Sequence, residues 1–273
     1  MKLKRKRLIR VALVPPLFTI GNLLCGFGSL TFAIKNNFLQ GAWLILLALV
    51  VFDGLDGLIA RATKSVSRFG AQLDSLADVV SFGVAPGFLS YEIIHQSSAH
   101  LISYKFTFLI CAFYVACSAL RLARFNVEST SEFAVHHHFT GLPTPAAAGF
   151  VASMIILNYE FADTVLSKFI PIALPFAVLI LSILMVSRLN YVHLLNKVTQ
   201  TKHPFIRLAE IILIGLMVAF YPEQGLFAVF LIYVLSTPVV TIYLKLFPSA
   251  KPKPGFIMPE KSRIDLPADK TEL

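Results

Sequence analysis

The chain has 273 residues, of which 56% are hydrophobic and 14% are charged, and its formal net charge is +9. A mean hydropathy of +0.74, with several apolar runs that approach the roughly 20 residues needed to cross a bilayer, excludes an ordinary soluble domain and predicts an all-α, polytopic membrane bundle. The positive charge does not indicate a nucleic-acid partner, because the Lys and Arg residues gather at the ends of apolar runs, where membrane topology and anionic headgroups account for them.

The chain begins with a basic segment, residues 1–16, and an apolar run follows it to about Ala33. This run has no small-residue cleavage site of the kind that ends a signal peptide. We therefore predict a juxtamembrane segment that leads into a first spanning helix. Pro15 and Pro16 are expected in the first turn of that helix, where the N–H that proline lacks would have no partner within the helix.

One polar residue, Asn22, interrupts this first apolar run. Two interpretations are open: a polar packing residue, or a contact to a headgroup or a nucleotide. Gly21 and Gly26 lie close to it in the sequence, and small residues at these positions permit a second helix to approach closely in either case.

Four aspartates lie within 26 positions between apolar runs. A charged side chain within a lipid-spanning helix costs roughly 2.5 to 3.5 kcal/mol, so the four carboxylates require compensation by cations, metal or water. Asp53 and Asp56 are three positions apart, on a helix expected over about 41–61. Asp74 and Asp78 are four positions apart on the next helix, so each pair projects from one helix face and the two pairs can converge.

The chemistry of this acidic cluster indicates a hard divalent cation. Mg²⁺ and Mn²⁺ prefer oxygen ligands, and two such ions about 3.5 to 4 Å apart can clamp a phosphoryl group during displacement. No Cys or His accompanies the aspartates, which argues against zinc.

About eight membrane helices are expected in all. They begin near residues 16, 41, 70, 104, 141, 171, 206 and 226. Residues 1–247 then form one membrane domain, and the segment 248–273 is rich in proline and charge and is expected to be a disordered tail.

The distribution of basic residues predicts the orientation of these helices. With eight spans, only Lys35, Lys105 and Lys168 fall on one side, and the other 21 of the 24 Lys and Arg fall on the opposite side. Cytoplasmic loops carry the excess of positive charge. Both termini and the acidic cluster are therefore expected to face the cytoplasm.

The segment from Asp53 to Asp78 reads D-x2-D-G-x2-A-R-x8-G-x3-D-x3-D. This pattern resembles, without a departure, the signature of the CDP-alcohol phosphotransferases. Three flanking segments, FGAQLDSLADVVSFGVAP, ALRLARFN and GLPTPAAAG, resemble the branch of that family that uses serine, the CDP-diacylglycerol–serine O-phosphatidyltransferases. The resemblance covers much of the first 150 residues.

The resemblance implies a role for each motif aspartate. The metal ligands would be Asp53, Asp56, Asp74 and Asp78, around two ions of Mg²⁺ or Mn²⁺. Asp78 would also be the catalytic base. In this mechanism the serine hydroxyl attacks the phosphorus that bears the diacylglycerol, CMP leaves, and phosphatidylserine forms.

The resemblance also implies contacts to the nucleotide of CDP-diacylglycerol. These would come from Gly57, Ala60, Arg61 and Gly70, with Asn22 as a plausible addition. Glycine and alanine allow the nucleotide to approach the backbone closely, and a guanidinium offers a bidentate match to a diphosphate.

Arg121 and Arg124 lie three positions apart at the end of the helix that begins near residue 104. They could bind the serine carboxylate or the lipid phosphate, or they could be positive anchors at the cytoplasmic surface. The expected partners are CDP-diacylglycerol, L-serine and the lipids of a bacterial or archaeal cell membrane, and a homodimer is left open.

Two other functions remain open for this sequence. A different acceptor in the same family, such as glycerol phosphate or inositol, would use the same metal centre, but a phosphorylated acceptor should require more basic residues. An ion-coupled transporter would spread polar residues through the membrane depth, often with internal repeats. The chain shows no clear repeat, and its acidic residues crowd one surface.

Overall fold

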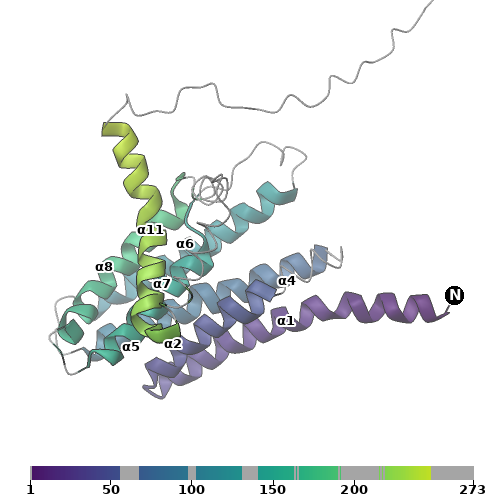
Figure 1. The fold of residues 1–273 in the computed structure, drawn as a ribbon, viewed down its shortest axis with the longest axis horizontal. Helices are drawn as coiled ribbons and strands as arrows, with labels where there is room; N and C mark the ends of the chain where they lie inside the picture. Colours follow the sequence, from purple (N-terminus) through teal and green to yellow (C-terminus); the bar gives the residue numbers. More distant parts are fainter. Residues whose placement is uncertain are drawn as a thin grey trace, which may run out of the picture.

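The computed structural model describes residues 2–55, 68–97, 103–130, 141–162, 164, 166–189, 191, 215, 217 and 219–246. All regular structure among these residues is helical, which confirms the expected fold class (Figure 1). The α-helices are α1 (Lys2–Ile34), α2 (Phe38–Leu47), α4 (Arg68–Asp78), α5 (Ala85–Gln96), α6 (Tyr104–Thr130), α7 (Thr144–Glu160), α8 (Leu166–Val186) and α11 (Pro222–Leu246). Two π-helical segments, η1 (Ala48–Asp53) and η2 (Val79–Val84), continue α2 and join α4 to α5.

The first helix is longer than the sequence predicted. α1 begins at Lys2, so Pro15 and Pro16 lie inside the helix and the expectation that they occupy its first turn is wrong. The preceding residues are mainly Lys, Arg and Leu, which favour helix and carry it through the basic segment. Figure 1 shows the N-terminal half of α1 extending beyond the other helices.

A tight turn connects α1 to α2. Asn36 adopts the left-handed conformation with φ 58°, which asparagine tolerates better than most residues. Asn37 then caps α2, because its side-chain oxygen accepts a hydrogen bond from the N–H of Gln40 at 3.4 Å. This hairpin lays α2 and η1 along α1, which also packs against α4, η2 and α5.

The core is centred on α7, which packs against α2, α8 and α11. Most of its residues are buried, as expected of a helix that is apolar on all sides. The segment before it is tied to the end of α8. Gly141, at φ 91°, donates from its N–H to the carbonyl of Leu189 at 2.8 Å, and Leu142 donates to Leu184 at 3.0 Å.

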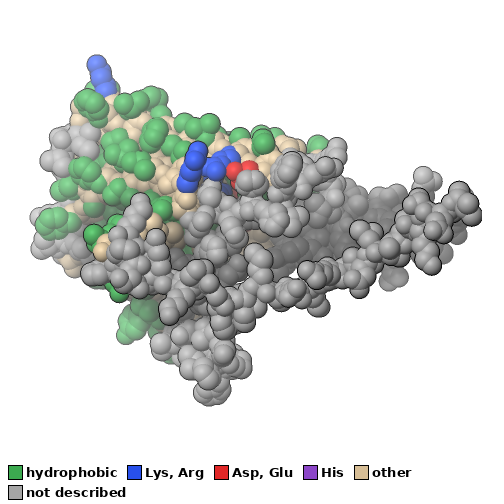
Figure 2. All heavy atoms as spheres, turned by 90° about the horizontal axis from the view of Figure 1, so that it is seen from above, with side chains coloured by type: hydrophobic (Ala, Val, Ile, Leu, Met, Phe, Trp, Pro, Cys, Tyr) green, Lys and Arg blue, Asp and Glu red, His purple; other side chains and the backbone are tan. Residues whose placement is uncertain are grey.

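Five helices in the described part of the chain are long and apolar enough to cross a membrane. They are Pro16–Ile34, Phe69–Gln96, Tyr104–Glu128, Phe169–Val186 and Pro222–Tyr243. The run Phe38–Asp53 is a shorter apolar helix. Figure 2 shows hydrophobic side chains spread over the described part of the visible face, as lipid contact requires. These features indicate an integral membrane protein.

The count of eight spans and the orientation remain predictions. Most of the run expected to begin near residue 206 lies outside the described residues, as does the expected tail at 248–273.

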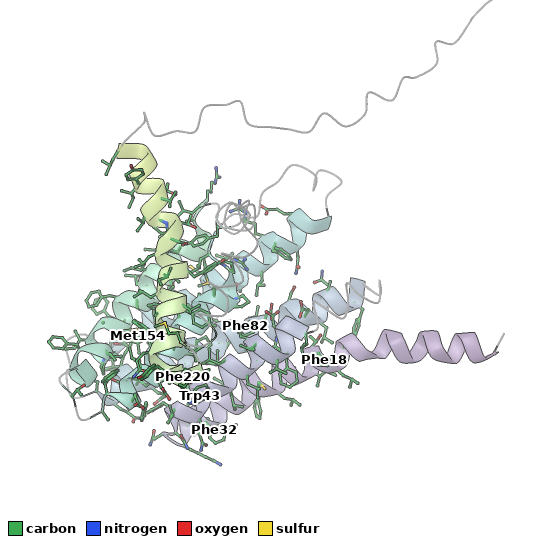
Figure 3. The ribbon with its side chains drawn as sticks, in the orientation of Figure 1. Phe18, Phe32, Trp43, Phe82, Met154 and Phe220 are labelled. Carbon is green, nitrogen blue, oxygen red and sulfur yellow. The ribbon has the colours of Figure 1, made fainter. Side chains whose placement is uncertain are left out.

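An open apolar groove of about 670 Å³ lies between α1, α2 and α11. Phe32 and Trp43 are among its lining residues, and Figure 3 shows them at one end of the bundle, away from Phe18. Among the described residues, no polar residue predicted for the functional site lines this groove.

Candidate metal centre

Three of the four motif aspartates converge. Asp53 is the last residue of η1, whereas Asp74 and Asp78 lie on α4. One carboxylate oxygen from each lies within 4.8 Å of the others. Asp78 is buried, and the other two are half-buried. Asp56 lies outside the described residues, so the structure leaves its predicted place in the cluster untested.

Both helices that carry these carboxylates change to π-helical geometry beside them. Asp53 ends η1, and Asp78 immediately precedes η2. A π-helical turn takes in one residue more than an α-turn and is frequent at functional sites. It therefore changes the angle at which neighbouring side chains project. Regular α-helices were expected at both places, and neither π-helical segment was predicted.

Asn22 lies beside the acidic cluster and is fully buried on α1. Its side-chain nitrogen Nδ2 donates to Oδ1 of Asp78 at 2.9 Å. Its backbone carbonyl accepts a hydrogen bond from Oγ of Ser81 in η2 at 2.8 Å. Asn22 therefore contacts the buried carboxylate directly and is more than a polar packing residue.

Two glycines allow α1 to come this close, as the sequence predicted. A Cβ atom on Gly26 would lie 2.7 Å from Cα of Ser81, which is closer than real contacts allow. A Cβ atom on Gly21 would overlap the ring of Phe52, the residue before Asp53. A larger residue at Gly26 would push α1 away from the backbone of η2, and a larger residue at Gly21 would displace the Phe52 ring beside Asp53.

The donor set of the cluster fits a hard divalent cation. The three grouped side chains offer only carboxylate oxygens, which suit Mg²⁺ or Mn²⁺. Burial of several carboxylates together is unfavourable unless positive charge compensates them. The cluster therefore supports the predicted metal site, and the number of ions remains a prediction.

The structure separates the two arginines that the sequence treated alike. Arg121 points inward: its Nη1 donates to Oγ1 of Thr144 at 3.0 Å, and its charge interacts with the carboxylate of Asp78. Arg124 is exposed and forms an ion pair with Glu128 at 2.7 Å. In Figure 2 a small group of basic side chains lies beside acidic ones, at the border between hydrophobic side chains and residues that are not described.

A second polar link, which the sequence analysis missed, joins α4 to α6. Nδ2 of Asn126 donates to Oγ of Ser75 at 2.9 Å. Ser75 lies on α4 beside Asp74, so this bond fixes the acidic helix against the end of α6. Asn126 is the last residue of the segment ALRLARFN. A polar side chain directly after an apolar run was the feature of the sequence that could have indicated this contact.

The predicted nucleotide contacts are only partly described. Gly70 is half-buried in the first turn of α4. Gly57, Ala60 and Arg61 lie outside the described residues. Their roles remain predictions.

Comparison with known proteins identifies the family. The family model for CDP-alcohol phosphatidyltransferase matches residues 12–184. The chain belongs to this family. The matched region contains Asn22, all four motif aspartates and both arginines, so the chain is a transferase of phospholipid metabolism with membrane helices.

Several relatives have related names. The CDP-diacylglycerol–serine O-phosphatidyltransferase of Helicobacter pylori is 36% identical over 181 residues, which cover 66% of this chain and 71% of the relative. The enzyme of that name from Bacillus subtilis is 33% identical over 181 residues, covering 66% of this chain and 90% of the relative. An archaetidylserine synthase of Methanothermobacter thermautotrophicus is 35% identical over 188 residues, covering 68% of this chain and 72% of the relative.

Proposed function

We propose that this protein transfers the phosphatidyl group of CDP-diacylglycerol to the hydroxyl of L-serine, which yields phosphatidylserine and CMP. The observation that carries the proposal is the convergence of Asp53, Asp74 and Asp78 next to Asn22, within the part of the chain that matches the family. The names of the relatives support serine as the acceptor.

The carboxylates of Asp53, Asp56, Asp74 and Asp78 would hold two divalent ions, Mg²⁺ or Mn²⁺. When bound, these ions would neutralise charge on the diphosphate as it divides. Gly57, Ala60, Arg61 and Gly70, together with Asn22, would bind the CDP moiety.

Asp78 would act as the base. Its buried carboxylate is held by Asn22 in one orientation, which a general base requires. As the serine oxygen forms a bond to the phosphorus of the diacylglycerol phosphate, its proton passes to Asp78. The bond between that phosphorus and the bridging oxygen breaks, and the oxygen leaves with CMP.

Arg121 would bind the serine carboxylate. Thr144 holds its Nη1, which leaves the guanidinium edge that contains Nε for a second partner. This Nε is buried, and no residue in the described ranges accepts a hydrogen bond from it. A carboxylate can accept hydrogen bonds from two N–H groups of a guanidinium at once.

We further propose that the protein crosses the membrane of a bacterium or archaeon eight times, with both termini and the metal centre on the cytoplasmic side. The one-sided distribution of Lys and Arg supports this orientation. Serine and CDP-diacylglycerol would then reach the same side of the membrane.

The test is an acceptor panel. The full-length purified protein is supplied with CDP-diacylglycerol, Mg²⁺ or Mn²⁺, and either L-serine, glycerol 3-phosphate or inositol, and the release of CMP is measured. We expect release with serine at a rate far above the other two. Release that depends on one of the other acceptors instead would contradict the proposed substrate while leaving the family chemistry intact.

A further inference from the structure

α11, the last helix in the described part of the chain, lies beyond residues 12–184, the part matched by the family model, yet it packs against α7 in the core. The rings of Phe227 and Phe150 lie 5.6 Å apart. The ring of Phe230 fills the space where a Cβ atom on Gly149 would be. These contacts indicate that α11 runs antiparallel to α7. The next turn of α11 therefore lies nearer to the start of α7.

That next turn carries Tyr233, which lies within electrostatic range of the Arg121 guanidinium. Arg121 in turn is bonded to Thr144 in the first turn of α7 and interacts with Asp78. The guanidinium of Arg121, on α6, is thus bonded to α7 and lies within electrostatic range of side chains from α4 and α11.

Tyr233 is held in place by Tyr191, which lies five positions after the last residue of α8. Their ring centroids are 5.8 Å apart, and the hydroxyl of Tyr191 donates to the carbonyl of Val234 at 3.1 Å. Burial, and secondarily the neighbouring Tyr233, raises the pKa of Tyr191 to about 12, so its hydroxyl stays protonated and keeps this bond. The middle of α11 is thus fixed at the end of the bundle where the segment before α7 meets α8.

Two buried polar atoms near this meeting point have no partner in the described part of the chain. One is Nε of Arg121, and the other is Oγ1 of Thr237, whose residue is only 3% exposed. Thr237 lies four positions after Tyr233, so both project from the same face of α11. A buried polar group without a partner costs about 1 to 3 kcal/mol, which favours a site that a polar ligand fills.

We propose that Tyr233 and Thr237 on α11 form one wall of the acceptor site and bind L-serine beside Arg121. The inference rests on the proposed function and extends it: a helix outside the family-matched region completes the acceptor site. The carboxylate of serine lies on Arg121, and the hydroxyls of Tyr233 and Thr237 serve as hydrogen-bond partners for its polar groups. Serine is thereby held with its own hydroxyl toward Asp78.

The test uses Tyr233→Phe and Thr237→Val in the full-length protein, because each change removes a hydroxyl and preserves the size of the side chain. We expect the KM for serine to rise about 10-fold or more, as for a lost hydrogen bond to a charged group. The KM for CDP-diacylglycerol should stay within about twofold. Tyr221→Phe, at an exposed residue just before α11, is the matched control and should leave both values unchanged.

Each outcome decides between a binding role and a structural one. A serine KM within about twofold of the wild type in both variants would overturn the inference, and so would an equal rise in KM for both substrates. Size-exclusion chromatography shows which variants are folded. If one variant does not fold, the KM values of the other variant decide whether α11 binds serine. If the wild type fails to use serine, the proposed function is contradicted as well. If the wild type uses serine and the variants have the same KM for serine as the wild type, only the proposed role of α11 is contradicted.

Discussion

The side chain of Asn22 donates a 2.9 Å hydrogen bond to the carboxylate of Asp78, a residue 56 positions further along the chain. Both residues are buried, so the bond is shielded from water. It connects the first membrane helix to the metal centre and fixes the orientation of the carboxylate to which we assign the role of base.

Replacing Asn22 by Ala should lower kcat by about 10- to 100-fold, because a hydrogen bond to a charged group contributes about 1.5 to 3 kcal/mol. The measurement is single-turnover CMP release at saturating substrate and metal. Ser29→Ala, at another fully buried polar residue of the same helix, is the control and should retain near-normal turnover. Equal losses in both variants would indicate a general packing defect of α1.

Removal of metal should abolish activity. The carboxylates of Asp53, Asp74 and Asp78 lie close enough to share a cation, and they repel one another without it. Treatment with EDTA should stop CMP release, and Mg²⁺ or Mn²⁺ should restore it. Binding of Mn²⁺, followed by electron paramagnetic resonance without substrate, provides a readout besides activity. Full turnover in the chelator, by a protein that contains no metal, would rule out the metal centre.

Asp78→Asn and Asp53→Asn should fail in different ways. The first keeps an oxygen for metal but cannot take the serine proton, so kcat should fall by roughly 10² to 10⁴. The second should weaken metal and CDP-diacylglycerol binding together, because the diphosphate is held through the metal. Titrations of metal and substrate, with single-turnover rates at saturation, separate the two. Near wild-type turnover of Asp78→Asn at saturating metal would make Asp78 a ligand only.

Arg121→Ala should raise the KM for serine much more than the KM for CDP-diacylglycerol, because Arg121 points toward Thr144 and Asp78. Arg124→Ala is the matched control: its side chain is 43% exposed and paired with Glu128, so we expect a small effect. Initial rates over a range of serine concentrations provide the comparison. Unchanged serine kinetics in Arg121→Ala would make this residue a positive anchor at the membrane surface.

The orientation can be tested by labelling. Single cysteines introduced at Lys64 and Lys197 should react with a membrane-impermeant maleimide from the cytoplasmic side only, because basic loops stay in the cytoplasm. A cysteine at Lys35 should react from the opposite side. The three native cysteines are buried and should contribute little background. Reversed labelling at any of these positions would contradict the orientation.

Hydropathy and spacing are local properties, and they were sufficient to predict the fold class and several helices. The helices expected near residues 104, 171 and 226 are observed to begin at Tyr104, Leu166 and Pro222. The i to i+4 spacing of Asp74 and Asp78 was likewise enough to place both carboxylates on one face of a helix.

The tertiary structure decided what depends on contacts between distant segments. The spacing of Arg121 and Arg124 could not tell which one faces inward, because that depends on Thr144, 23 positions beyond Arg121. The π-helical segments beside Asp53 and Asp78 were also invisible in the sequence, since they accompany packing against α1. Tyr233 comes within electrostatic range of Arg121 because α11 packs against α7, which no local pattern encodes.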